Sequence, residues 1–487
     1  MKVNIGRCSG VLLHVTSLPG RFGIGDLGPE SRKFVDFLQQ ARQKLWCVLP
    51  LGPAGEENSP YRSPSAFAGN SLFISPELLE DQGYVSKKDL SFHSRSRPSK
   101  VDFASVRAFK EHLLQKAFRA FSTTKEYSAF LRRNSWWLDR YALFMALREA
   151  NHGLPWPRFD PGIQPAPATI RFHKFVQFEF FRQWNLLHRF CGERNISVMG
   201  DMPFYIEHDS ADVWSNPELF DLDNDGEPAT VGGVPPDYFS ADGQLWGTPT
   251  YNWKNLQKTD FHWWLDRFRS AFETVDLLRL DHFRGFEAFW RVPAKERTAR
   301  NGYWSKGPGA RLFETLQKKL GHLPIVAENL GIITPEVEKL RRRFAFPGMA
   351  VLQFGFDEKG VHRPNNYIRE LACFTGTHDN DTTRGWWDNL LNTARTRSAD
   401  RAAVKRIKSF LQTEGEEIHW SCMQAILTSV AEIAVVPMQD LLGLGSEARM
   451  NLPGKAKGNW GWRFTSDQLN RNVIERLRDL TVVSGRA

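Results

Sequence analysis

Eight short apolar segments recur along the chain, and each ends in polar residues or glycine. They span residues 11–17, 45–52, 196–205, 275–283, 324–331, 349–356, 373–380 and 432–440. Several are apolar at nearly every position, as a strand covered on both faces must be. Amphipathic helical patterns lie between them, for example at Phe34, Phe37, Leu38 and Ala41, over residues 170–193, and at Val337, Leu340 and Phe344. The pattern predicts parallel strands that alternate with helices.

Strand and helix repeated about eight times is the arrangement of a (β/α)8 barrel, so we predict an α/β fold of the TIM-barrel type. An open doubly wound sheet is the alternative, but no G-x-G-x-x-G follows the first strand to support nucleotide binding. Residues 53–195 separate the second and third predicted strands, and residues 206–274 separate the third and fourth. We therefore predict a single catalytic barrel over residues 1–487 with large insertions after strands 2 and 3.

The two insertions differ in pattern. Residues 53–195 combine a basic, serine-rich loop at 91–100 with helical stretches around 104–150 and a long aromatic helix, which predicts a helical subdomain. Residues 223–253 have almost no periodicity and read as a long loop. Such a loop in a compact domain is usually functional or disordered, and its five aromatic residues favour function. We expect this loop to cover the active site.

Composition and charge narrow the class of protein. Hydrophobic residues make up 41% and charged residues 24% of the 487 residues, which is enough apolar material for a substantial core. The net charge of +9 is spread along the chain, which favours a solvated basic surface over a nucleic-acid site. Five cysteines lie far apart without a C-x-x-C pair, and no apolar run approaches membrane-spanning length. We predict a cytoplasmic protein with no membrane or nucleic-acid partner.

Carboxylates stand at three predicted strand ends, where a barrel of this type places its active site. Arg279 and Asp281 are two residues apart, so strand alternation points both side chains to one face, and the guanidinium would keep the carboxylate ionised. Glu328 follows an apolar run that would raise its pKa, and Asp379 follows His378 among small residues. Each carboxylate alone could be a helix or turn cap. Together, in an aromatic-rich chain without a phosphate loop, they favour glycoside chemistry.

Glycoside chemistry of this kind needs one carboxylate as nucleophile and a second as acid and then base. A third carboxylate can stabilise the positive charge that develops on the sugar. Metal ligation is not indicated, because His378, Asp379 and Asp381 lack a standard ligand spacing and residues 221–228 lack the closing Glu of a calcium loop. We therefore predict no metal and no cofactor.

Several motifs, in order, cover nearly the whole chain. They are SGVLLHVTSLPGRFGIGDLG (9–28), SPYRSPSAFAGN (59–70), GDMPFYIEHDSADVW (200–214), GGVPPDYFSADGQLWGTPTYNW (232–253), RLDHFRGF, AENLG, GTHDNDTTRGWW, VVPMQDLLGLGSEARMNLPG (435–454) and NWGWRF (459–464). On these motifs the chain resembles the amylomaltases, which are 4-alpha-glucanotransferases (disproportionating enzymes) related to the alpha-amylase clan. The resemblance implies a (β/α)8 transferase of carbohydrate metabolism that moves a segment of an α-1,4-glucan to the 4-hydroxyl of another glucan or of glucose.

The resemblance also implies roles for individual residues. Asp281 matches the covalent nucleophile with Arg279 as its charge partner, Glu328 matches the acid/base, and Asp379 matches the third carboxylate, in a retaining double displacement. The implied substrate contacts are Arg279, His378, Asp201, Tyr61, Trp246, Ser59 and Asn380. Asp201 could equally be a cap, and packing is the alternative role for Tyr61 and Trp246, the latter in the family's mobile acceptor loop.

The chain departs from the family pattern at Asn329, where the family usually has Asp, but Glu328 itself is in place. The implied partners are donor and acceptor glucans, with no obligate protein partner. A plain α-glucan hydrolase with the same three carboxylates is the nearest alternative function. A glycan-binding protein without catalysis is the alternative from another class, and the intact carboxylates argue against it.

Overall fold

Parallel strands form the central sheet of the computed structural model, which describes residues 6–55, 57–93, 97–236, 240–357 and 360–487. Their order in the sheet is β10-β11-β12-β1-β2-β3-β6-β9. They are β1 (Cys8–Leu12), β2 (Leu45–Cys47), β3 (Ser197–Met202), β6 (Leu277–Leu280), β9 (Ile325–Ala327), β10 (Gly348–Val351), β11 (Leu371–Phe374) and β12 (Ile433–Pro437). Each lies at a predicted segment. The first begins earlier than its apolar run, because Cys8 to Gly10 already pair with β12.

The two ends of this sheet meet. The amide of Ala327 in β9 donates a 2.8 Å hydrogen bond to the carbonyl of Pro347, just before β10. Because β9 and β10 stand at opposite ends of the strand order, this contact closes the sheet into a barrel. The prediction of a (β/α)8 barrel is confirmed, and the doubly wound alternative is wrong.

Alternating side chains fill the barrel interior in layers. The buried inner residues include Cys47, Met199, Leu277, Val326 and Val435. Side chains of a strand point inward at every second residue. The next inward positions after Met199, Leu277 and Val326 therefore carry polar groups at the C-terminal ends of β3, β6 and β9, where the apolar layers stop.

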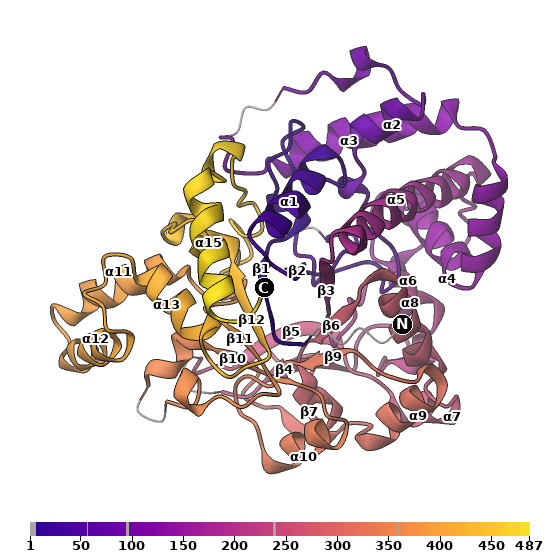
Figure 1. Ribbon diagram of the computed structural model, residues 1–487. Helices are drawn as coiled ribbons and strands as arrows, with labels where there is room; N and C mark the ends of the chain where they lie inside the picture. The colour runs from indigo at the N-terminus through magenta and orange to yellow at the C-terminus, as the bar shows by residue number, and fades with distance from the viewer. Residues whose placement is uncertain (1–5, 56, 94–96, 237–239, 358–359) are drawn as a thin grey trace.

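Helices surround the barrel, and Figure 1 shows them around the central strands. They are α1 (Pro29–Gln40), α2 (Pro76–Asp81), α3 (Phe103–Ala120), α4 (Lys125–Ala150), α5 (Pro167–Glu193), α6 (Ala211–Ser215), α7 (Trp253–Lys258), α8 (His262–Thr274), α9 (Ala310–Leu320), α10 (Pro335–Arg343), α11 (Thr383–Ala394), α12 (Ser398–Leu411), α13 (Ile418–Leu427), α14 (Met438–Leu441) and α15 (Arg471–Val483). In the described part of the chain, no helix is both long and apolar enough to cross a membrane.

Between β2 and β3 the chain forms α2 to α5, which gather on one side of the barrel in Figure 1. The predicted helical stretches of residues 104–150 and 170–193 correspond to α3, α4 and α5. Proline at the first position of α5 suits a helix start, and the middle of α5, from Phe175 to Phe180, is buried on every side. Residues 94–96 of the predicted basic loop lie outside the described residues.

The second insertion contains strands that the pattern did not predict. β4 (Thr230–Val234) and β5 (Gln244–Pro249) join β7 (Ala288–Pro293) and β8 (Tyr303–Lys306) in an antiparallel sheet of order β5-β4-β7-β8. The prediction of a continuous long loop was therefore wrong here. Glycine hides the strand periodicity of β4, and Gly232 is required because a Cβ there would lie 2.4 Å from the ring of Tyr205. Residues 237–239, which the predicted loop includes, lie outside the described residues.

Candidate active site

Two neighbouring strand ends hold an arginine between two carboxylates. Nη1 of Arg279 in β6 lies 2.6 and 2.8 Å from the two carboxylate oxygens of Asp201 in β3. Nη2 of Arg279 lies 2.8 Å from Oδ1 of Asp281. Burial alone would lower the pKa of Arg279, but the two carboxylates hold it well above its usual range. The arginine is therefore a fixed positive charge between Asp201 and Asp281.

Glu328 sits just beyond the end of β9, where two backbone amides bind its carboxylate. The amide of His282 donates to Oε2 at 2.8 Å, and the amide of Leu330 donates to Oε1 at 2.7 Å. Burial, and then the negative charge of Asp281, raises the pKa of Glu328 from 4.5 to about 7. A carboxyl group with a pKa near 7 can both give and take a proton at neutral pH, which suits general acid and base chemistry.

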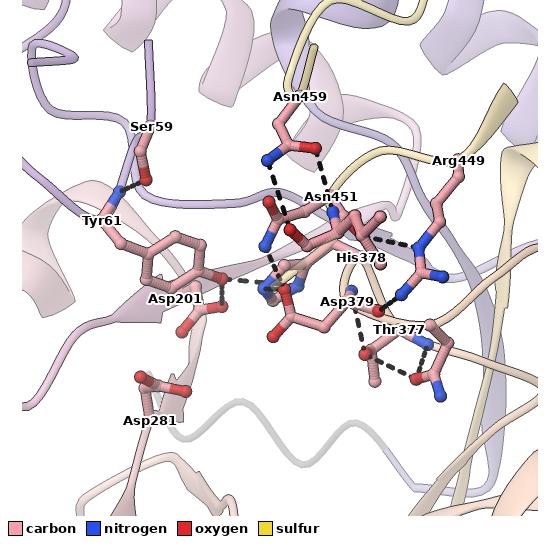
Figure 2. A network of polar contacts seen from close by, with 12 residues as sticks. Ser59, Tyr61, Asp201, Asp281, Thr377, His378, Asp379, Arg449, Asn451 and Asn459 are labelled. Atoms are coloured by element: carbon pink, nitrogen blue, oxygen red, sulfur yellow. Dashed lines mark hydrogen bonds and ion pairs between the residues drawn. The ribbon is translucent and has the colours of Figure 1, made fainter. Parts of the chain in front are cut away.

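Tyr61 connects the first insertion to the barrel centre. Its hydroxyl donates a 2.7 Å hydrogen bond to Asp201, and its ring stacks on the ring of His378 at a centroid distance of 5.0 Å. Figure 2 shows the Tyr61 hydroxyl between Asp201 and His378. Ser59 accepts the Tyr61 amide through Oγ at 3.3 Å, so this side chain shapes the turn that carries Tyr61.

Asp201 is 3% exposed, and its carboxylate binds Arg279 and Tyr61 in place of a helix N-terminus. This geometry favours the predicted orienting role over the cap. Burial raises the pKa of Asp201, and the charge of Arg279 opposes that rise. Asp201 thus links the loop of Tyr61 to the charge that faces Asp281.

Asp379 lies beside His378 in Figure 2, and its side chain is 48% exposed. Its Oδ1 accepts a 2.6 Å hydrogen bond from Asn451 and lies 3.4 Å from Nε2 of His378. Arg449 donates to the Asp379 carbonyl at 2.5 Å. Asn451 and Arg449 come from the loop after α14 and were not predicted, although they belong to the quoted segment 435–454.

Trp246 and Asn380 have surroundings that differ from those expected. Trp246 belongs to strand β5 and not to a loop, and its ring lies edge-on to His282 at 4.9 Å between centroids. Oδ1 of Asn380 accepts the amide and hydroxyl of Thr377, at 2.9 and 2.8 Å. These two bonds shape the turn that carries Asp379. The side-chain oxygen of Asn380 is therefore used within the protein.

Residues of the two insertions hold the 59–70 loop in place, and no pattern in the sequence predicts them. Gln177 of α5 exchanges two hydrogen bonds with the backbone of Gly69, at 2.8 and 2.9 Å. Asp212 of α6 accepts the Ala66 amide at 2.7 Å. Burial raises the pKa of Asp212 to about 6. Helices of both insertions thus hold the loop from which Tyr61 reaches the barrel.

The comparisons with known proteins agree with this geometry. The family model for 4-alpha-glucanotransferases matches residues 13–469. The chain belongs to this family. A 4-alpha-glucanotransferase of Synechocystis sp. is 47% identical to it, over 99% of this chain and 98% of that protein. The 4-alpha-glucanotransferase of Thermus thermophilus is 43% identical, over 99% of this chain and 100% of that protein.

A solved relative extends the likeness to the whole fold. The amylomaltase from Streptococcus agalactiae in complex with acarbose is 37% identical and superposes with a TM-score of 0.93, over 99% of this chain and 100% of that one. The resemblance found in the motifs is thereby confirmed. This 4-alpha-glucanotransferase family member is an enzyme, so the alternative of a glycan-binding protein without catalysis is wrong.

Proposed function

We propose that this family member transfers a segment of an α-1,4-glucan to the 4-hydroxyl of an acceptor glucan or glucose, by a retaining double displacement through Asp281 and Glu328. The observation that carries the proposal is a carboxylate paired with a largely buried arginine next to a second, partly buried carboxyl group of raised pKa. Two carboxyl groups whose environments differ in this way are suited to act as nucleophile and acid.

In the first step, Oδ of Asp281 attacks the anomeric carbon while Glu328 gives its proton to the glycosidic oxygen that leaves. Arg279 binds the carboxylate of Asp281 through the 2.8 Å contact, which orients the nucleophile and places a positive charge beside it. The product is a glucosyl ester on Asp281 and a shortened glucan with a free 4-hydroxyl. The carboxylate of Glu328 remains.

In the second step, Glu328 accepts the proton of the acceptor 4-hydroxyl, whose oxygen displaces Asp281 from the anomeric carbon. The charge of Asp281 is one cause of the raised pKa of Glu328. That charge is absent while Asp281 carries the sugar, so the pKa of Glu328 falls when a base is needed. Release of Asp281 restores the charge and the proton affinity of Glu328 for the next cycle.

The remaining site residues surround the place where the sugar reacts. Asp379 supplies a third negative charge that stabilises the oxocarbenium-like transition state. Tyr61 and His378 form a stacked aromatic surface beside it, which suits contact with the sugar at the cleavage point. The ring of Trp246 lies edge-on to the ring of His282, and the amide of His282 binds the acid/base Glu328, so Trp246 is our candidate for contact with an acceptor sugar.

The decisive experiment incubates the purified protein with maltotriose alone and resolves the products by size. Glucose together with maltopentaose and longer chains, at constant total reducing ends, is the expected result. Shortening with rising reducing ends would make the chain a hydrolase. No change in the maltotriose would refute the assignment.

Two variants test the roles of the carboxyl groups. Asp281→Asn and Glu328→Gln should each lower turnover by about 1,000-fold or more while the fold persists. Asp479→Asn, an exposed position on α15, is the matched control and should keep full activity. Near-normal turnover of either active-site variant would contradict its role.

The cellular setting is also a proposal. All five cysteines are free and buried, which supports a reducing compartment such as the cytoplasm. The donor and acceptor glucans are the partners that the proposed reaction requires. Fractionation of cells that express the tagged chain, with detection in the soluble cytoplasmic fraction, tests the location.

A further inference from the structure

Asn329, the residue next to Glu328, uses both polar atoms of its side chain at the closing seam of the barrel. Its Oδ1 accepts a 2.7 Å hydrogen bond from the amide of Met349 in β10. Its Nδ2 donates a 2.7 Å hydrogen bond to Oε1 of Glu338 in α10. An asparagine side chain offers an acceptor at one end and donors at the other, and this site uses each end.

The partner carboxylate is itself fixed. Arg341, 5% exposed, binds Glu338 through Nη2 at 2.8 Å and donates through Nη1 to the carbonyl of Phe346 at 2.5 Å. Gly348 lies against the side-chain amide of Asn329. A Cβ at position 348 would be only 3.0 Å from both Oδ1 and Nδ2 of Asn329. The amide group is therefore enclosed between helix α10 and strand β10.

This arrangement bears directly on the acid/base carboxylate. One oxygen of Glu328 is bound by the amide of Leu330, the residue that follows Asn329. The direction of that amide depends on the backbone at Asn329, which is tied to β10 and α10 through its side chain. A rotation at Asn329 would move both the Glu328 side chain and one of its two donors.

We propose that Asn329 and Glu338 are positioning residues that fix Glu328 for proton transfer. The inference rests on the proposed function of Glu328, and it assigns to the seam between β9 and β10 a role in catalysis as well as in closing the barrel. Neither residue touches the sugar. Their effect reaches the reaction through the backbone of residues 328–330.

The test measures kcat, KM and the pH profile of maltotriose disproportionation for Asn329→Ala and Glu338→Ala. Asn329→Ala loses both hydrogen bonds, and we expect kcat to fall about tenfold or more with KM within about twofold. Glu338→Ala should also lower kcat, and the double variant should be no slower than Asn329→Ala alone. Lys339→Ala, at an exposed neighbouring position on α10, is the control and should match the wild type.

Asn329→Asp gives a readout that a purely structural role would not move. It keeps the acceptor for Met349, but it replaces the donor to Glu338 by a carboxylate oxygen and adds a negative charge on the residue next to Glu328. A nearby negative charge raises the pKa of a carboxyl group. The basic limb of kcat/KM, which reports the acid in the free enzyme, should therefore move to higher pH.

The outcomes separate this inference from the proposed function. Wild-type protein that leaves maltotriose unchanged refutes the proposed function, whatever the variants do. Active wild-type protein with Asn329→Ala at an unchanged kcat refutes the positioning role alone. The same holds if the two alanine effects multiply, or if Asn329→Ala lowers only thermal stability.

Discussion

Replacing Glu328 by Gln should remove a pH-dependent penalty from the stability of the folded protein. The pKa of Glu328 is raised from 4.5 to about 7, so ionising it in the folded chain costs about 3 kcal/mol more than in the unfolded chain, at about 1.4 kcal/mol per pKa unit. Below pH 4.5, Glu328 is protonated in both the folded and the unfolded chain, and its full contribution to the stability of the fold is present. That contribution is lost as the pH rises from 4.5 through about 7.

The glutamine side chain of the Glu328→Gln variant cannot ionise, so the variant does not lose this stability as the pH rises. The difference in the free energy of unfolding between variant and wild type should therefore rise by about 2–3 kcal/mol in favour of the variant from pH 4.5 to pH 8. The Gln amide can accept only one of the two backbone donors that bind Glu328. The cost of that mismatch is the same at each pH, so it cancels from the change with pH.

Denaturant unfolding of both proteins at several pH values between 4.5 and 8 measures this difference. Asp281→Asn provides a matched background, because it removes one of the two causes of the raised pKa. The rise with pH should be smaller there. A difference that stays constant with pH, or that falls, would refute the argument that Glu328 is held protonated by its surroundings.

Two further variants test contacts that hold the barrel and the third carboxylate. Arg486 is fully buried and donates hydrogen bonds to backbone carbonyls that include those of Cys8 and Ala431. Arg486→Met should therefore lower the free energy of unfolding by about 3–5 kcal/mol in denaturant titrations. A variant as stable as the exposed control Arg478→Met would contradict this. Asn451→Ala removes the 2.6 Å bond to Asp379 and should lower kcat/KM about tenfold in the maltotriose assay, and unchanged kinetics would show that Asp379 does not depend on it.

The barrel could be predicted because its strands are covered on both faces. Strands such as Ile433 to Pro437 are buried at every position, so they stand out in the sequence as unbroken apolar segments. The sheet of β4, β5, β7 and β8 leaves no comparable signal. β4 pairs with β7, about sixty residues later in the chain, and glycines occupy two of its positions. Its formation depends on contacts between distant segments, which local periodicity does not record.

The site was predictable to the extent that it follows from strand alternation. Arg279 and Asp281 are two residues apart, and the structure brings them into contact. The groups that hold the site come from elsewhere. Gln177, from a helix of the first insertion, binds Gly69 in the loop that carries Tyr61, and Asn451, from a loop after the last strand, binds Asp379. Backbone donors such as the amide of Leu330 are identical in every sequence, so no residue type could reveal them.

Transfer in place of hydrolysis requires that an acceptor sugar outcompete water, and the sheet position of Trp246 bears on this. A covering loop that orders only when the acceptor arrives would cost conformational entropy at each binding event. Trp246 instead belongs to β5 and follows Leu245, which pairs with Gly233 of β4, and its ring lies edge-on to His282. The amide of His282 in turn binds Glu328. On the proposed role of Trp246, an acceptor sugar would meet a ring that is already ordered, and this would favour the sugar over water because no loop has to be ordered at each binding event.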